Sequence, residues 1–258
     1  MKNIIEIKEK IMPEIELLAK ECGKIMLEAK ITDKGSMISS KEGLNNYVTV
    51  FDKKIQTIAK NRLKEILPEA FFMGEENNEQ DDISHGYAFI VDPIDGTSNF
   101  IKGMRRSCIS IGLTLDASPV AGVIYDPYGN FLYSAVKGYG AFMNGEKIHV
   151  NNDKTIDGIV SVGTAPYNVE LKNSVIDQIS KYLGKCLDIR RLGSAALDLC
   201  DIAAGRTCLY FEPIVNPWDY CAGAVIVTEA GGKVSTFEGD PLEFTHTTSI
   251  KASNGIAE

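Results

Sequence analysis

The chain has 258 residues, 44% of them hydrophobic, enough to bury the core of one large α/β unit or two small ones. The formal net charge is −8 without any long basic run, so neither a nucleic-acid polymer nor an anionic membrane is the expected main partner. No apolar stretch reaches membrane-span length, the N-terminus lacks a signal peptide's apolar core, and the six scattered cysteines favour free thiols in the cytoplasm.

The first part of the chain is predicted to alternate amphipathic helices with short strands. In chain order these elements are a helix over 4–28, a strand over 47–51, a helix from about 53 to 67 and a strand over 71–73. Residues 31–46, rich in Lys, Ser, Gly and Asn, are predicted to form a loop. Two acids stand at element ends: Asp52 follows the first strand, and Glu75 follows the second.

The segment 92–100, Asp-Pro-Ile-Asp-Gly-Thr-Ser-Asn-Phe, is the most informative in the chain. It follows an apolar run over 87–91 that predicts a buried strand. Asp92 and Asp95 emerge at the end of this strand, Gly96 permits close approach to the backbone, and the next three residues are all competent helix N-caps. Acidic ligands beside the free N–H groups of a helix start predict a divalent metal next to a phosphate.

The rest of the chain changes character near residue 150. Before it, β-like runs separated by turn signals are predicted at 108–115, 119–125, 131–136 and 140–150. The pair Asn144-Gly145 predicts a type I′ hairpin. After a polar connection at 151–157, strands are predicted at 159–163, 187–191, 207–211 and 232–236, alternating with helices at 169–182, 195–204 and 218–230. We therefore expect two halves, 1–150 and 151–258, in one compact unit with a layered α/β or α+β fold.

Five carboxylates stand at the ends of predicted elements: Asp52, Glu75, Asp92, Asp95 and Asp219. Asp219 follows Pro217, which places it in the first turn of a predicted helix. Asp52, Glu75 or Asp219 by itself is more commonly a helix cap or a solvated surface acid than a metal ligand. The segment from Asp92 to Asp95 could by itself be either a capping turn or a metal site. If these acids converge, they would repel one another without cations, whereas Mg²⁺ prefers such oxygen ligands.

Four motifs resemble those of the inositol monophosphatase family. Segment 92–100 resembles the first family signature, and 218–223, continuing to 229–232, looks like the second. Residues 74–76 match the segment of the metal-ligand glutamate, and 48–52 match the segment of the N-terminal aspartate. Their order and spacing agree over nearly the whole chain, which a lone short motif would not achieve.

The resemblance implies a Mg²⁺-dependent, lithium-sensitive phosphomonoesterase with alternating αβαβα layers, usually a homodimer, with two or three Mg²⁺ ions per site. It implies that the metal ligands are Glu75, Asp92, the backbone carbonyl of Ile94, Asp95 and Asp219. Thr97 paired with Asp52 would help to deprotonate a metal-activated water, with Glu75 assisting. The phosphate would rest on the N–H groups of Gly96 and Thr97, and Lys41 matches a lysine near the active site.

The resemblance further implies a small phosphate ester as substrate, with inositol 1-phosphate or a similar polyol phosphate favoured. The implied substrate-binding residues are Ile94, Asp95, Gly96, Thr97, Gly193, Ser194, Ala195, Glu212 and Asp219. A carboxylate such as Glu212 can accept hydrogen bonds from polyol hydroxyls. The alternative for Glu212, which precedes Pro213, is that it merely ends a strand.

Other functions stay open at this point. Ser98 replaces a threonine found in many inositol-selective members, and Arg105 with Arg106 follow the phosphate turn. These arginines could hold a second phosphate, as in a 3′(2′),5′-bisphosphate nucleotidase or a fructose-1,6-bisphosphatase, or they could be surface charges or reach a dimer partner. Histidinol phosphate is a further family substrate, and a non-catalytic metal- or phosphate-binding regulatory protein is the alternative outside enzymes.

Overall fold

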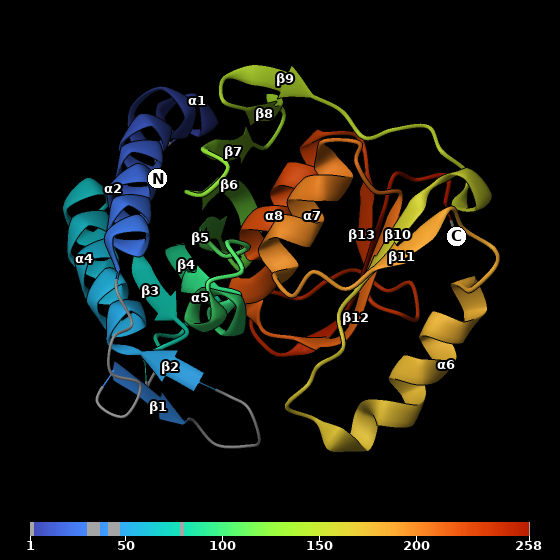
Figure 1. The fold of residues 1–258 in the computed structure, drawn as a ribbon. Helices are drawn as coiled ribbons and strands as arrows, with labels where there is room; N and C mark the ends of the chain where they lie inside the picture. The colour runs from blue at the N-terminus through green and yellow to red at the C-terminus, as the bar shows by residue number, and fades with distance from the viewer. Residues whose placement is uncertain (1–2, 30–36, 41–46, 78–79, 258) are drawn as a thin grey trace.

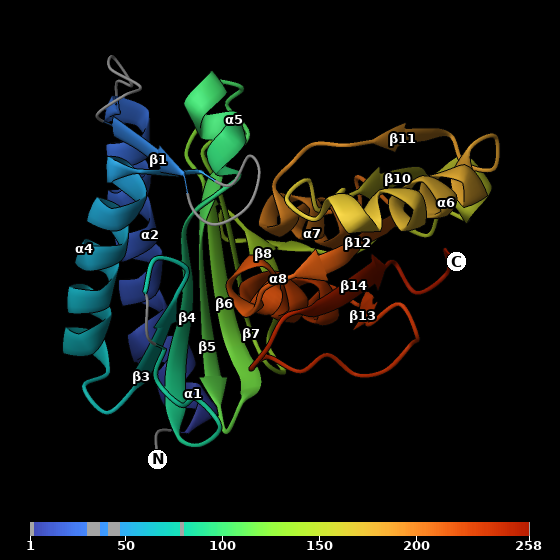
Figure 2. The same cartoon turned by 90° about the horizontal axis from the view of Figure 1, so that it is seen from below.

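The computed structural model describes residues 3–29, 37–40, 47–77 and 80–257, and helices and sheets alternate along its long dimension (Figure 1). Seen from below, the pair α2 and α4 lies on one face of a large sheet, α7 and α8 lie on its other face, and a second sheet and α6 follow (Figure 2). The expected αβαβα layering is therefore present. Within the described part of the chain, no helix is both long and apolar enough to cross a membrane.

The larger sheet carries the acidic motif at the end of one strand. Its described strands are β3 (Phe71–Gly74), β4 (Tyr87–Asp95), β5 (Cys108–Leu115), β6 (Ser118–Asp126), β7 (Phe131–Val136), β8 (Gly140–Met143) and β9 (Glu146–Ile148), which lie side by side in chain order. β3 and β4 are parallel, and each later neighbour is antiparallel. Asn144 and Gly145 both have positive φ, 53° and 83°, as a type I′ turn requires. The predicted hairpin is confirmed.

Two helical segments cover the outer face of this sheet. The predicted helix over 4–28 is confirmed as one helical run: α1 (Ile4–Glu6), a π-helical stretch η1 (Ile7–Ile11) and α2 (Met12–Glu28). α4 (Val50–Ile66) packs beside α2, and the apolar stripes of both helices bury against β4 and its neighbours. An amphipathic helix is stabilised mainly by this burial of its apolar face.

The inner face of the large sheet is covered by α8 (Pro217–Glu229), beside which α7 (Ala195–Ala203) packs. α8 is buried on nearly every side and approaches the strands closely. A Cβ at Gly122 would stand 2.5 Å from the Ala222 carbonyl oxygen, and one at Gly112 would stand 2.5 Å from the Cys221 Sγ. Glycines in β5 and β6 thus let the helix that carries Asp219 lie against the strands.

The smaller sheet is mixed and belongs to the C-terminal half. In the order β11-β10-β12-β14-β13, its described strands are β11 (Asp188–Arg190), β10 (Ile159–Val162), β12 (Leu209–Val215), β14 (Thr248–Ser253) and β13 (Lys233–Ser235). The helices η2 (Thr155–Asp157), η3 (Val169–Leu171) and α6 (Lys172–Tyr182) complete this half. β14 is absent from the prediction because its alternating polar residues give a weak strand signal, and pairing with β12 and β13 compensates for this.

Three local predictions beside the acidic motif were wrong. The strand predicted over 47–51 is only β2 (Tyr47–Thr49), because Thr49 caps α4 and the helix begins at Val50. The predicted loop over 31–46 contains a strand, β1 (Ile38–Ser40), which pairs with β2. Residues 30–36 and 41–46, including Lys41, lie outside the described residues. The three residues after Gly96 were the expected N-caps of a helix. Instead, α5 (Thr97–Lys102) begins directly after Gly96, and no side chain caps it.

Candidate active site

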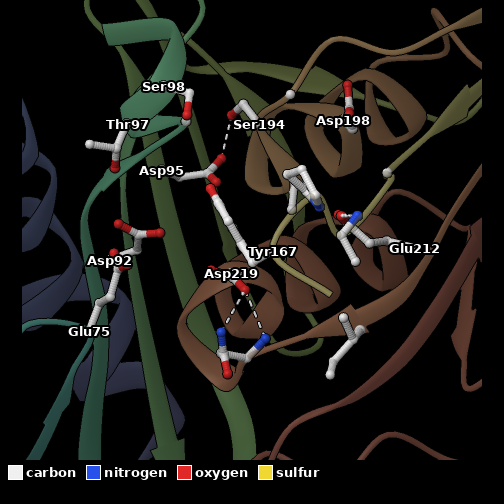
Figure 3. A pocket seen from close by; sticks show the side chains of 18 of the residues that line it. Glu75, Asp92, Asp95, Thr97, Ser98, Tyr167, Ser194, Asp198, Glu212 and Asp219 are labelled. Atoms are coloured by element: carbon white, nitrogen blue, oxygen red, sulfur yellow. Dashed lines mark hydrogen bonds between the residues drawn. The ribbon is translucent and has the colours of Figure 1, made fainter. Parts of the chain in front are cut away.

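A cavity of about 530 Å³ opens where the end of β4 meets the N-terminal ends of α7 and α8. The implied site residues that line it are Glu75, Asp92, Ile94, Asp95, Gly96, Thr97, Gly193, Ser194, Ala195, Glu212 and Asp219. Figure 3 shows side chains from β4, α7 and α8 pointing into this space. Residues more than 140 positions apart in the sequence, such as Glu75 and Asp219, therefore share one cavity.

Three carboxylates form the centre of the cavity. Among the described residues, Asp92, Asp95 and Asp219 each offer an oxygen, and these oxygens all lie within 4.8 Å of one another. Two of them come from β4, whose register against β5 shifts between Asp92 and Asp95. Such an irregularity re-aims side chains next to functional sites. Asp219 reaches the cluster from the first turn of α8, where it also accepts a hydrogen bond from the Asn216 N–H at 2.7 Å.

Glu75 joins the cluster because β3 and β4 are parallel neighbours. Gly74 pairs with Val91, and the Glu75 N–H donates to the Val91 carbonyl at 3.2 Å. This places Glu75 beside Asp92, where the Glu75 charge adds to burial in raising the pKa of Asp92. The sequence placed Glu75 at the end of a strand, but the neighbouring strand decides which acid it meets.

Burial dominates the electrostatics of the three acids. It raises the pKa of Asp92 and of Asp219 well above the usual range, and the neighbouring acids raise both further. Burial also raises the pKa of Asp95 to about 6, although hydrogen bonds from Ser194 and Ala196 act in the opposite direction. Clustered hard oxygen donors that are costly to ionise by themselves fit a divalent cation such as Mg²⁺, whose charge would offset this cost.

Asp52 and Thr97 meet beside this cluster. The Thr97 Oγ1 lies 3.3 Å from an Asp52 carboxylate oxygen and 3.0 Å from the Ile94 carbonyl oxygen, to either of which it can donate. Asp52 is fully buried, and its other oxygen accepts from the Thr49 N–H at 2.8 Å. Burial raises the pKa of Asp52 to about 7, and Glu75 and Glu76 add to this rise.

The start of α7 supplies hydrogen bonds to Asp95. The Ser194 hydroxyl donates to the Asp95 carboxylate, and the Ala196 N–H donates to the same oxygen at 3.0 Å. The Ser194 Oγ also accepts from the Leu197 N–H at 3.4 Å, so Ser194 caps the helix. Ser194 lines the cavity as expected, yet its hydroxyl is engaged with Asp95.

Glu212 lines the cavity from the middle of β12. The strand continues to Val215, so the alternative that Glu212 merely ends a strand was wrong. One carboxylate oxygen accepts from the Tyr210 hydroxyl at 2.7 Å, and the other accepts from the Ala165 N–H at 3.0 Å. Each oxygen keeps a further acceptor position because a carboxylate oxygen has two lone pairs.

Arg105 and Arg106 are not among the described residues that line the cavity. The Arg106 guanidinium donates to Asp198 at 3.0 Å and to Asp201 at 2.7 Å, and both acids are buried on α7. Arg105 is exposed, with its guanidinium 5.8 Å from the centre of the Tyr128 ring. This placement does not support the second-phosphate hypothesis, and Arg106 does not fit the surface-charge alternative either.

Several cavity and positioning residues are absent from the sequence predictions. Most residues of the loop over 163–168 line the cavity. The buried Asn99 side chain donates to the carbonyls of Arg106 and Leu192, each at 2.8 Å, and so ties the segment after Gly96 to the α7 approach. One sequence feature could have identified this loop as part of the site: it follows a predicted strand of the alternating half. Ligands commonly bind at the carboxyl ends of parallel strands.

Comparison with known proteins agrees with this geometry. The model of the Inositol monophosphatase family matches residues 8–258. The chain is 35% identical to Nus factor SuhB of Escherichia coli K12 over 78% of this chain and 76% of that protein. It is also 35% identical to Inositol monophosphatase 2 of Solanum lycopersicum, over 79% and 80%.

Among solved structures, the extragenic suppressor protein suhB of Bartonella henselae superposes with a TM-score of 0.88. The two chains are 32% identical, and the match covers 95% of this chain and 93% of that one. A family match over nearly the full length, relatives above 30% identity and the shared fold lead to one conclusion. This chain belongs to the inositol monophosphatase family.

Proposed function

We propose that this protein is a Mg²⁺-dependent phosphomonoesterase acting on a small polyol phosphate, with inositol 1-phosphate as the favoured substrate. The observation that carries the proposal is the meeting of Asp92, Asp95 and Asp219 oxygens within 4.8 Å of one another, inside a cavity that Thr97 also lines. A non-catalytic binding site for phosphate would not need a buried base-and-hydroxyl pair next to it. The proposal includes lithium sensitivity, a homodimer and a cytoplasmic location.

The donor set fits two or three Mg²⁺ ions, with Glu75, Asp92, the Ile94 carbonyl, Asp95 and Asp219 as the residues that would hold them. When bound, Mg²⁺ supplies positive charge that stabilises the phosphoryl oxygens and makes water a stronger acid. The Ile94 carbonyl oxygen lies 3.0 Å from the Thr97 Oγ1, and its two lone pairs would let it face a cation whether or not it accepts from that hydroxyl.

The Thr97–Asp52 pair is positioned to take a proton from the attacking water. The Thr97 hydroxyl would accept the proton while passing its own to the Asp52 carboxylate, 3.3 Å away. Burial raises the pKa of Asp52 to about 7 in the metal-free site, which makes this carboxylate a stronger base than an exposed aspartate. Glu75 would assist by orienting the water, and the N–H groups of Gly96 and Thr97 would hold the phosphate.

The far side of the cavity would bind the alcohol part of the ester. Gly193, Ala195 and Glu212 line it, and the acceptor positions that remain on the Glu212 carboxylate can receive polyol hydroxyls. The name Inositol monophosphatase 2 of the tomato relative supports inositol phosphate ahead of bisphosphorylated or histidinol esters. The position of Arg106 away from the cavity supports the same ranking.

A second candidate function is a non-catalytic regulatory role. The observation that favours it is the name Nus factor, carried by the Escherichia coli relative, which does not describe a phosphatase. The complete set of acids and the Thr97–Asp52 pair in this chain favour catalysis instead. The two functions make opposite predictions about phosphate release.

The test is Mg²⁺-dependent phosphate release from inositol 1-phosphate, fructose 1,6-bisphosphate, histidinol phosphate and 3′-phosphoadenosine 5′-phosphate, with and without lithium. We expect the inositol ester to give the highest kcat/KM. Asp95→Asn and Glu75→Gln should each lose most of the activity while keeping the native circular dichroism. Glu9→Gln, an exposed acid outside the described cavity lining, is the control and should behave like the wild type.

Each outcome of this assay is decisive. A preference for either bisphosphate would overturn the choice of substrate, and near-normal turnover in Asp95→Asn or Glu75→Gln would refute the site. A folded wild-type protein that releases no phosphate from the whole panel would instead support the regulatory role.

A further inference from the structure

Tyr167 occupies a position in the cavity that the proposed chemistry does not use. It lies on the loop over 163–168, lines the cavity and is 41% exposed. Figure 3 shows its side chain among the labelled acids, with the hydroxyl end toward Asp95. Ser98, which follows Thr97 in the phosphate turn, lines the same cavity, so the Tyr167 ring brings the C-terminal half into the space beside the turn where phosphate would bind.

The loop that carries Tyr167 is held from several sides. The Gly163 N–H donates to the Phe211 carbonyl at 2.8 Å, and the Arg191 Nε donates to the Thr164 hydroxyl at 3.2 Å. Ala165 has a φ of 40°, which is uncommon for a residue other than glycine, and its N–H donates to Glu212 at 3.0 Å. The loop is therefore built in one conformation, and Tyr167 is pre-positioned over the cavity.

The side of the cavity formed by Tyr167 is less polar than the acid cluster. Pro166 and Ile214 line the cavity together with the Tyr167 ring. A phosphate seated at Gly96 and Thr97 would direct its ester oxygen away from that turn, so the alcohol part would lie toward these residues. Aromatic rings offer a large and rigid contact surface with few rotatable bonds, which suits packing against the C–H face of a cyclic alcohol.

We infer that Tyr167 is a specificity-determining residue, whose ring contacts the alcohol part of the ester and favours cyclic alcohols over short, flexible ones. This inference rests on the proposed function and adds to it a residue that distinguishes between the alcohol leaving groups of different esters. Glu212 acts on specificity a second way, as the positioning residue that holds the Ala165 N–H and with it the Tyr167 loop.

The experiment compares kcat and KM for inositol 1-phosphate and for glycerol 2-phosphate in the wild type, Tyr167→Ala and Tyr167→Phe. Tyr167→Ala should raise KM for the inositol ester about tenfold and for the glycerol ester less than about threefold. Its kcat should stay within about threefold, because the acid cluster is intact. Tyr167→Phe keeps the ring and should retain most of the preference, and inhibition by inorganic phosphate should not change in either variant.

Val169→Ala is the matched control, since Val169 follows the same loop and is 61% exposed but lies outside the described cavity lining. If Tyr167→Ala loses its native circular dichroism, Tyr167→Leu provides the same comparison with more of the side chain's volume kept. Equal changes in KM for the two esters, or no change, would overturn the inference and leave the proposed function standing. A wild-type protein that hydrolyses neither ester would overturn both.

Discussion

The Ser194 hydroxyl donates a hydrogen bond to the Asp95 carboxylate, and this bond joins the two halves of the chain at the centre of the cavity. Ser194 caps α7, so the orientation of that helix and of the carboxylate are coupled. The Ala196 N–H adds a second bond to the same oxygen. Asp95 therefore presents its remaining lone pairs in a direction that α7 determines.

Ser194→Ala should weaken Mg²⁺ binding about tenfold, because outer partners that orient a metal ligand typically contribute at least that much. The backbone bond from Ala196 should keep Asp95 in the cavity, so the loss should be partial. Isothermal titration with Mg²⁺ measures the effect, with Ser180→Ala, an exposed serine on α6, as the control. Unchanged Mg²⁺ affinity in Ser194→Ala would show that the hydrogen bond from Ser194 does not orient Asp95 for metal binding.

Arg106→Ala should lower the free energy of unfolding by about 3–5 kcal/mol, because it removes the guanidinium that pairs with the buried acids Asp198 and Asp201. Arg206 still pairs with Asp201 at 2.9 Å, so Asp198 should account for most of the loss. The adjacent Arg105→Ala removes an exposed cation–π contact and should cost at most about 1 kcal/mol. Urea denaturation of the two variants gives the comparison, and equal losses would contradict the assigned roles.

Asp52→Asn and Thr97→Ala should each lower kcat by about 10² to 10⁴ while KM changes only a few-fold, because the pair acts on a proton in the transition state. In Asp52→Asn the new amide oxygen can still accept from the Thr49 N–H, so the start of α4 should persist. Thr57→Ala, which removes an exposed hydroxyl on the same helix, is the control. Steady-state kinetics that show a normal kcat in either site variant would remove that residue from the proton path.

The metal-free protein should lose stability as pH rises from about 4 to about 7, the interval between the ordinary pKa of an aspartate, 3.8, and the raised pKa of Asp52. The sign follows because the folded state binds more protons than the unfolded chain over this interval. Asp52→Asn lacks this titration, so it should gain stability relative to the wild type as pH rises.

Thermal unfolding in EDTA at about pH 5 and about pH 8 measures the difference between the two proteins. We also expect Mg²⁺ to raise the wild-type unfolding temperature more at the higher pH, because bound cations favour the ionised acids. A constant difference between Asp52→Asn and the wild type over this range would contradict the raised pKa of Asp52.

The elements that the sequence predicted well are those whose signal is local. β5 coincides with the predicted strand over 108–115, and the hairpin at Asn144 follows from turn residues that tolerate positive φ. Hydrophobic periodicity marked α2 and α4 because each helix buries apolar residues on the packed side. β14 escaped prediction, since its strand character comes from its neighbours in the sheet.

The sequence by itself determined the kinds of side chains available to the cavity. The acidic motif ends a buried strand, and the few residues that carry its chemistry are adjacent in the chain. Only the tertiary structure decided which of these side chains meet. Parallel pairing of β3 with β4 brings Glu75 to Asp92, and close packing of α8 on two strand glycines brings Asp219 to both. The same packing assigned Arg106 to buried acids and Tyr167 to the cavity, since long-range contacts depend on how distant segments fit together and leave no local pattern.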